Sequence, residues 1–214
     1  MDDTVAIDVA GETLLLHADR AAWWPVRHSL FIADLHLGKG DSLRAAGIPV
    51  PTGGSEHDLS RLTALIRQTD IRRLWILGDF LHGSRKDGSW REQWLAFRAM
   101  HAELDIRLVL GNHDRAMPGL GLDIPCFSGS VAEEPFVLVH APAEGEPDGP
   151  MRICGHLHPV TRAPGLPGRH PAFVLEAGQI ILPAFSAFTG GSLADERSER
   201  IACIAGHLLR IPGR

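Results

Sequence analysis

Long apolar runs are missing from this chain of 214 residues. Its longest apolar stretches are the length of a strand, and none approaches the roughly 20 residues that a membrane-spanning helix needs. The N-terminal residues are acidic and contain no apolar core of the kind found in a secretory signal peptide. We therefore expect a soluble, cytoplasmic protein that has no membrane partner.

Cysteine is scarce as well. The chain has three cysteines, which are odd in number and far apart in the sequence: Cys126, Cys154 and Cys203. They form neither a disulfide framework nor the closely spaced pair of a structural zinc site. We expect them to be small, buried side chains in a reducing compartment.

Positive charge is in deficit too, with 21 lysines and arginines against 26 acidic residues and a formal net charge of -5. This balance argues against a protein that coats duplex DNA through bulk electrostatics. A local nucleic-acid site stays open, because bound metal ions would reverse the sign of the charge there. Since no repeat or linker divides the chain, we expect a single domain over residues 1–214.

The first half of the sequence alternates between strand and helix patterns. Residues 5–9 and 13–17 predict a hairpin. Three short apolar segments are typical of buried strands: residues 29–33, 73–77 and 106–110. Amphipathic helices are predicted at 55–69 and 90–103, with Ser55 and Ser89 as candidate capping residues.

The second half is rich in strand patterns joined by turns. After Gly121 five segments predict strands: residues 136–139, 151–154, 172–176, 179–182 and 201–205. Strand–helix alternation followed by a strand-rich half predicts an α/β fold of two packed sheets with outer helices.

Side chains that can bind metals gather at the ends of these strands. Each follows an apolar run: Asp34, His36, Asp79, His82, Asn112, His113, Asp114, His140, His156 and His158. The carboxyl ends of parallel strands form the ligand-binding edge of an α/β sheet, so we expect these groups to meet. A carboxylate can bridge two cations, and a mixed nitrogen and oxygen donor set favours manganese, iron or zinc. The sequence therefore predicts a site for two divalent metal ions.

Five motifs resemble, in order, those of the calcineurin-like metallophosphoesterases: Asp34-Leu-His36, Gly78-Asp79, Gly111-Asn112-His113-Asp114, His140 and Gly155-His156-Leu157-His158. One of them alone would be a weak signal, whereas five in sequence, each after a strand, are specific. The resemblance implies a four-layer α/β/β/α sandwich. It also implies hydrolysis of a phosphoester with the help of two divalent metal ions.

The resemblance assigns roles to individual residues. It implies seven metal ligands: Asp34, His36 and His158 for the first metal, Asn112, His140 and His156 for the second, and Asp79 as the bridge. His113 is expected to donate a proton to the leaving group or to stabilise the charge on phosphorus. Asp114 is expected to orient it, although it could instead cap the following turn. His82 is expected to contact the scissile phosphate, or alternatively to support Asp79.

Basic residues in the loops that follow the ligand segments are candidates for binding flanking phosphates: Lys39, Arg44, Arg85 and Lys86. A charged loop residue is, however, more often simply solvated.

Four segments carry a narrower resemblance: residues 37–40, 44–51, 78–83 and 182–191. They are similar to the bacterial ligase-associated DNA damage response endonucleases, over nearly the whole chain. That resemblance implies manganese, DNA phosphodiesters as substrates and a role in repair. It also implies a functional association with an ATP-dependent DNA ligase, a helicase and an exonuclease. We expect a preference for single-stranded DNA, whose flexible backbone can bend into a metal site.

Two alternatives stay open. A phosphomonoesterase or a nucleotide phosphodiesterase of the same superfamily would share the motifs and differ in its substrate loops. A non-catalytic scaffold with this fold would have lost ligands, whereas here all seven ligand positions are filled.

Overall fold

The computed structural model describes residues 3–83, 88–145 and 147–214. Two of the predicted substrate-binding residues, Arg85 and Lys86, lie outside the described residues. The expectation of a single domain over the whole chain stays a prediction.

The first sheet follows the order of the sequence: β1 (Thr4–Val9), β2 (Glu12–His17), β3 (Ala21–Trp24), β4 (Ser29–Ile32), β5 (Arg73–Leu77), β6 (Asp105–Val109) and β7 (Cys126–Phe127). Its strands pair antiparallel from β1 to β4 and parallel from β4 to β7. The carboxyl ends of β4, β5 and β6 therefore lie at one edge of the sheet, which is where α/β proteins bind ligands.

The second sheet is built from the rest of the chain: β8 (Ser130–Glu133), β9 (Phe136–Val139), β10 (Met151–Cys154), β11 (Pro159–Thr161), β12 (His170–Glu176), β13 (Gln179–Ile181), β14 (Ser192–Leu193), β15 (Glu199–Ile204) and β16 (His207–Ile211). Its order is β14-β11-β12-β13-β10-β9-β8, and β15 and β16 extend it from β12. β10 runs parallel to both β9 and β13. The carboxyl ends of β9 and β10 therefore also lie together.

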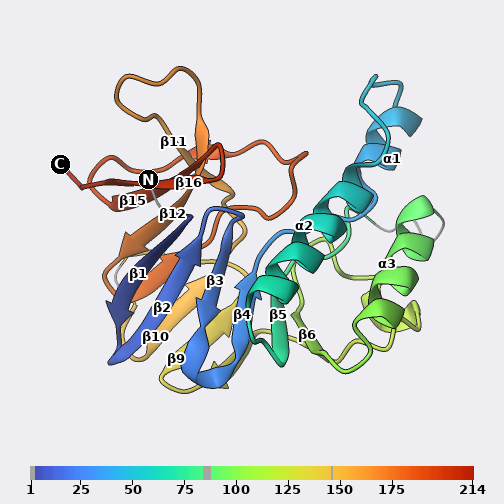
Figure 1. Cartoon of the computed structure of the whole chain (residues 1–214), viewed down its shortest axis with the longest axis horizontal. Helices are drawn as coiled ribbons and strands as arrows, with labels where there is room; N and C mark the ends of the chain where they lie inside the picture. Colours follow the sequence, from blue (N-terminus) through green and yellow to red (C-terminus); the bar gives the residue numbers. More distant parts are fainter. Residues whose placement is uncertain (1–2, 84–87, 146) are drawn as a thin grey trace.

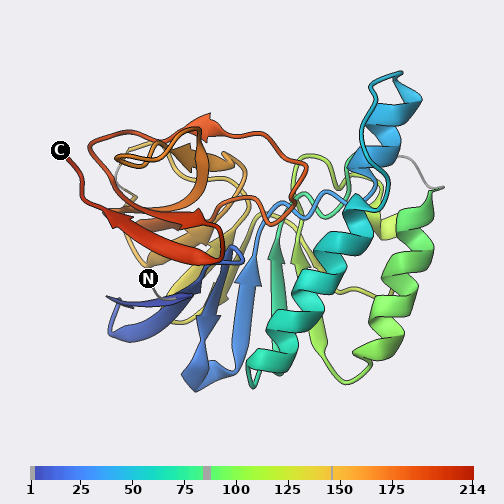
Figure 2. The ribbon, with the colours of Figure 1, turned by 45° about the horizontal axis from the view of Figure 1, so that its top comes forward.

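Helices cover the outer face of the first sheet. The covering helices are α2 (Gly54–Gln68) and α3 (Ser89–Met100). The chain also forms α1 (Lys39–Ala45) and short 3-10 turns at Pro25–Arg27 and Met117–Gly119. α2 and α3 lie side by side, while α1 projects beyond the end of α2 (Figures 1 and 2). Within the part of the chain that the structure describes, no helix is long and apolar enough to cross a membrane.

Two apolar cores separate these layers. Leu62 of α2 and Trp94 of α3 pack with Leu74 and Ile106 on the outer face of the first sheet. On its inner face, Trp24 and other side chains pack against the second sheet. The hydrophobic effect stabilises both contacts, by about 25 cal/mol for each Å² of apolar surface that is buried. The expected sandwich of two sheets is confirmed.

The expected outer helices are found on the first sheet. Among the described residues no α-helix follows Met100, so none forms an outer layer on the second sheet. The outer face of that sheet instead carries a small apolar cluster around Val139, Cys154, Val174 and Ile181.

The helix ends differ from their predicted capping. Both α2 and α3 follow a glycine, and neither N-cap makes a side-chain hydrogen bond. Ser55 instead accepts a hydrogen bond from the backbone N–H of Gly38, at 3.1 Å. Ser89 donates to Asp41 of α1, at 3.2 Å. Both serines connect their helices to the α1 region, a contact between distant residues that a local capping pattern cannot show.

Candidate metal centre

Glycines allow the strand ends of the two sheets to converge. A Cβ on Gly78 would lie 1.9 Å from His140 Nδ1, and one on Gly155 would lie 2.6 Å from Asp34 Oδ2. The sheets also join directly, since Ala33 after β4 forms a bridge with Ala184 after β13. Gly78 before Asp79 and Gly155 before His156 are therefore needed for close approach.

The first cluster contains four of the predicted ligands: Asp34, His36, Asp79 and His158. One ligand atom from each lies within 4.8 Å of all the others. His36 Nε2 is 3.2 Å from His158 Nε2 and 3.9 Å from Asp79 Oδ2. His158 Nε2 is 3.6 Å from Asp34 Oδ1. This spacing suits one cation that is shared by two imidazoles and two carboxylates.

The second cluster shares Asp79 with the first and adds His140 and His156. His140 Nε2 lies 3.6 Å from Asp79 Oδ1 and 3.0 Å from His156 Nδ1. The side-chain oxygen of Asn112 is 3.0 Å from the same His140 nitrogen. All seven predicted ligands thus lie together, with Asp79 in the bridging place; their role as ligands stays a prediction.

Backbone groups aim these side chains. The N–H of His156 donates to Asp34 Oδ2 at 2.8 Å, and the N–H of His113 donates to Asp79 Oδ1 at 2.9 Å. Among the described residues, Asp34 Oδ1 is buried and has no hydrogen-bond partner. His140 Nδ1 lies 3.1 Å from the carbonyl of Leu77, which leaves Nε2 free for a metal when Nδ1 carries the proton. A buried carboxylate oxygen without a hydrogen-bond partner and an imidazole with a free nitrogen can both bind a cation.

The backbone is strained at these positions. Five of the predicted ligands have left-handed φ values of 46–72°: Asp34, His36, Asp79, His156 and His158. Such conformations are uncommon for residues other than glycine and persist where the surroundings force them. Their concentration at one edge of the sandwich marks that edge as a functional site.

The charge state of His36 also suits a metal ligand. Burial, with a further contribution from the charge of Lys39, lowers the pKa of His36 to about 2. The imidazole is therefore neutral and keeps a lone pair for a cation, which an imidazolium could not offer. The donor set combines nitrogen and oxygen atoms and fits manganese, iron or zinc.

His113 and His82 lie at the rim of the first cluster. The side chain of His113 is 39% exposed, and its Nε2 lies 4.0 Å from Asp79 Oδ2. Its ring stacks on that of His82, with centroids 5.4 Å apart and an angle of 20° between the planes. The His36 ring meets both edge to face. Both imidazoles therefore stand beside the metal centre, where a substrate would arrive.

Asp114 contacts backbone groups of two loops, and its role in orienting His113 stays a prediction. Its buried carboxylate accepts hydrogen bonds from the backbone N–H groups of Gly111, Phe80 and Leu81, at 2.9, 3.3 and 3.1 Å. No hydrogen bond joins it to the His113 ring among the described residues. Burial raises the pKa of Asp114, and these N–H groups oppose the rise. Asp114 holds together the two loops that carry Asp79 and His113.

The described basic candidates differ in their surroundings. Lys39 is half-buried, and its ammonium donates to Thr189 Oγ1 at 3.3 Å. Arg44 forms an ion pair with Asp41 and donates to the carbonyl of Pro51 at 2.8 Å. The guanidinium of Arg44 is therefore engaged in holding α1 against the loop that follows it.

Residues 182–191 carry part of the narrower resemblance, but the sequence assigned Thr189 itself no role in the site. The glycine pair that follows Thr189 in the sequence was a signal that the backbone passes close to another segment here. A Cβ on Gly191 would lie 2.1 Å from the carbonyl of His158, so this loop passes directly against a predicted ligand.

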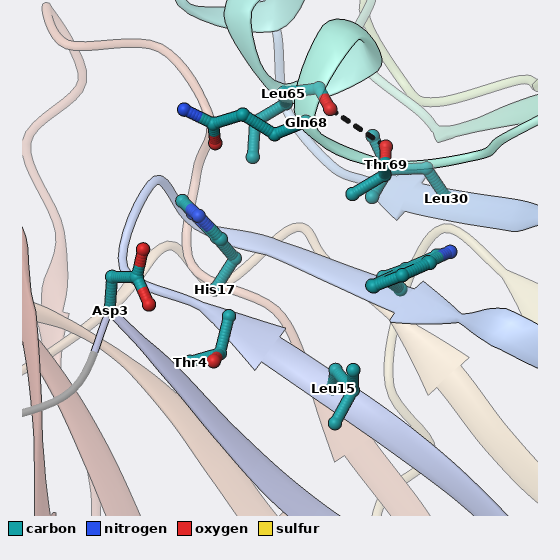
Figure 3. Close-up of a pocket in the computed structure, with 9 residues that line it drawn as sticks. Asp3, Thr4, Leu15, His17, Leu30, Leu65, Gln68 and Thr69 are labelled. Atoms are coloured by element: carbon teal, nitrogen blue, oxygen red, sulfur yellow. Dashed lines mark hydrogen bonds between the residues drawn. The ribbon is translucent and has the colours of Figure 1, made fainter.

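A separate cavity of about 190 Å³ lies between the end of α2 and the first strands. Figure 3 shows Leu65 and Thr69 on one side of it and His17 on the other. Thr69 donates to the carbonyl of Leu65, and His17 Nδ1 accepts from the Asp19 N–H. The indole Nε1 of Trp23, which also lines the cavity, is buried without a hydrogen-bond partner among the described residues. We assign it no chemistry.

The family model for calcineurin-like phosphoesterases matches residues 28–142. The chain belongs to this family, and it is a metal-dependent phosphoesterase.

Among solved structures, the chain is similar to the crystal structure of Pseudomonas putida nuclease MPE, with 33% identity and a TM-score of 0.84. The match covers 97% of this chain and 99% of that one. A protein of unknown function from Aquifex aeolicus, AQ665, has 19% identity and a TM-score of 0.44, over 61% of this chain and 78% of that one. No curated protein matches the chain.

Proposed function

We propose that the chain is a manganese-dependent phosphodiesterase that cleaves single-stranded DNA internally and serves in bacterial DNA repair. One observation carries the proposal: two candidate ligand clusters share Asp79 in a chain that is 33% identical, over 97% of its length, to a nuclease. The family alone would equally fit a phosphomonoesterase or a nucleotide phosphodiesterase.

The seven predicted ligands would hold two divalent cations, with Asp79 between them. Such cations supply positive charge that offsets the charge of the phosphoryl group in its transition state. Manganese is the proposed occupant, because the ligands are imidazoles, carboxylates and an amide oxygen. Iron and zinc suit the same donors.

We assign proton transfer to His113. Imidazole is the side chain best suited to carry a proton near neutral pH. The His113 ring is partly exposed beside Asp79, a position that supports a role in protonating the oxygen that leaves phosphorus. We also propose that His82, whose ring stacks on that of His113, contacts the scissile phosphate.

Charge supports single-stranded DNA as the substrate. A net charge of -5 gives little electrostatic grip on a long duplex, whereas a single strand can bend its backbone into the metal centre. Lys39, Arg44, Arg85 and Lys86 are the proposed contacts to flanking phosphates. The proposed setting is the cytoplasm, in functional association with an ATP-dependent DNA ligase, a helicase and an exonuclease.

The test is to incubate the protein with circular single-stranded DNA and Mn²⁺, and in parallel with aryl phosphomonoesters and phosphodiesters. We expect nicking of the circle, which has no ends, and hydrolysis of the diester. Chelator should stop both reactions and Mn²⁺ should restore them. Strong monoesterase activity with intact circular DNA would reject the nuclease and favour the phosphomonoesterase. Binding of DNA without any hydrolysis would favour the scaffold.

A further inference from the structure

A charged network that no catalytic role uses is buried beside the metal centre, where it holds residues 184–189. Asp58 of α2 is 2% exposed, and both of its carboxylate oxygens accept the N–H of Ala187, at 3.1 and 3.2 Å. Arg61 donates to the carbonyl of Phe185 at 2.9 Å and to Asp58 at 3.0 Å. Two side chains of α2 therefore fix the backbone of this segment.

Arg20 holds the same segment from the first sheet. It donates to the carbonyls of Ala184 and Ser186, at 3.3 and 2.9 Å. The N–H of Ser186 in turn donates to the carbonyl of Asp34, at 3.3 Å. A buried ion network costs solvation energy and is weak evidence for stability. Its clear effect here is to hold residues 184–189 in one position against a predicted ligand.

The far end of the segment contacts the helices at the rim of the site. The ring of Phe188 packs on Gly54, where a Cβ would lie 2.4 Å from it. The hydroxyl of Thr189 accepts from the ammonium of Lys39 at 3.3 Å. The backbone N–H of Lys39 donates to the carbonyl of His36 at 3.2 Å. Lys39 is therefore held at both ends, by a predicted ligand and by Thr189.

The ammonium of Lys39 lies within electrostatic reach of the metal centre. Burial lowers the pKa of Lys39, and the carboxylates of Asp34 and Asp79 partly oppose this. The charge of Lys39 is also the second contribution, after burial, that lowers the pKa of His82. Because the backbone of Lys39 is hydrogen-bonded to the predicted ligand His36, a cation in this place would attract an anion bound at the metal centre.

We propose that Thr189 is a positioning residue that holds the Lys39 ammonium beside the metal centre, where it binds a nonbridging oxygen of the substrate phosphodiester. The inference rests on the proposed function, because it presupposes a phosphodiester in the site. Thr189 acts on Lys39 and not on the substrate, and the network of Asp58, Arg61 and Arg20 keeps it in place.

A mutant cycle tests this inference through kcat and KM on bis(4-nitrophenyl) phosphate and on circular single-stranded DNA. Lys39→Met should lower kcat/KM roughly 10- to 100-fold, since a charged hydrogen bond is lost. Thr189→Val, which removes the acceptor and keeps the shape, should lower it about 3- to 10-fold. Thr189→Ser keeps the hydroxyl acceptor and should have the kcat/KM of the wild-type protein. The double variant should match Lys39→Met within a factor of about 2, because Thr189 has nothing left to position.

Arg67→Met is the control for loss of a positive charge, since Arg67 is exposed in the last turn of α2, and it should leave kcat/KM unchanged. Wild-type activity in Thr189→Val would overturn the inference. So would a finding that Thr189→Val lowers kcat/KM by the same factor in the Lys39→Met background as in the wild-type protein. Either result leaves the proposed function intact. A wild-type protein that hydrolyses no phosphodiester would overturn both.

Discussion

The two sheets contribute different chemistry to the same site. The first sheet supplies the carboxylates of Asp34 and Asp79, whose side chains are 0% and 3% exposed. The second sheet supplies three imidazoles, of which His140 is buried, the His158 side chain is 20% exposed and His156 is exposed. Both carboxylates therefore come from one sheet, and the predicted ligands of the other sheet are all imidazoles.

Each predicted cluster takes side chains from both sheets, so the site exists only where the sheets meet. The buried carboxylate of Asp34 receives its hydrogen bond from the second sheet's His156 N–H. A buried charge without such a partner is costly, so the sheets depend on one another electrostatically as well as through packing. Variants on either side of this junction should separate loss of metal, loss of chemistry and loss of stability.

The largest expected effect is at Asp79, which both clusters share. Asp79→Ala should lose both metals and lower phosphodiester hydrolysis by orders of magnitude, since among the described residues Asp79 alone belongs to both clusters. Metal analysis and turnover of an aryl diester measure this. Asp70→Ala, which removes an 80% exposed carboxylate, is the matched control and should change neither. Near-normal turnover of Asp79→Ala would exclude a shared ligand.

The second effect separates chemistry from metal binding. His113→Ala should keep its metals, because its Nε2 lies at the rim, 4.0 Å from Asp79 Oδ2. Loss of a general acid should lower kcat by about 10²–10⁴-fold. The loss should be larger for DNA than for an aryl diester, whose leaving group needs less protonation. His57→Ala, an exposed imidazole on α2, is the control. Loss of metal from His113→Ala would instead make His113 a ligand.

The third effect concerns how closely the sheets approach. In Gly155→Ala the new methyl would lie 2.4 Å from the Cβ of Ala33 and 2.6 Å from Asp34 Oδ2. We expect a loss of metal affinity of about 10- to 100-fold, the size seen when the support of a ligand is disturbed. Titration with Mn²⁺ while following hydrolysis measures it. Gly119→Ala, which meets no atom within 4 Å, should bind metal normally. Equal affinities in the two variants would contradict the close-approach argument.

The strand-end residues were predictable because their signal is local. Each follows an apolar run, and the rule for parallel strands brings their side chains to one edge. Strands β4, β5 and β6 lie within a residue or two of their predicted positions. α2 was also predictable, since Leu59, Leu62 and Leu65 recur on one face and all three are buried.

Other features depend on contacts between distant segments, which a single sequence does not reveal. None of the residues of α1 is buried, and its sequence has no apolar periodicity from which a helix could be predicted. The three backbone N–H groups bound by Asp114 belong to two loops about 30 residues apart, so its role requires the fold. The Asp58 network likewise joins α2 to a segment more than 100 residues later.

The smallest effect should appear in stability alone. Phe136 opens β9 and is 1% exposed; its ring meets Trp24 of the first sheet edge to face, with centroids 4.9 Å apart. Phe136→Leu keeps an apolar side chain but loses this pair, which is worth about 0.5–1.5 kcal/mol beyond its area. Thermal unfolding should shift down by about 2–4 °C for each kcal/mol lost. Turnover with saturating Mn²⁺ should stay normal, because His140 follows the opposite end of β9. Leu166→Ala, at a side chain that is 41% exposed, is the control and should shift neither quantity. A fall in turnover together with stability would contradict this expectation. It would mean that packing at the far ends of the strands also sets the geometry of the metal centre, in addition to the convergence at their carboxyl ends.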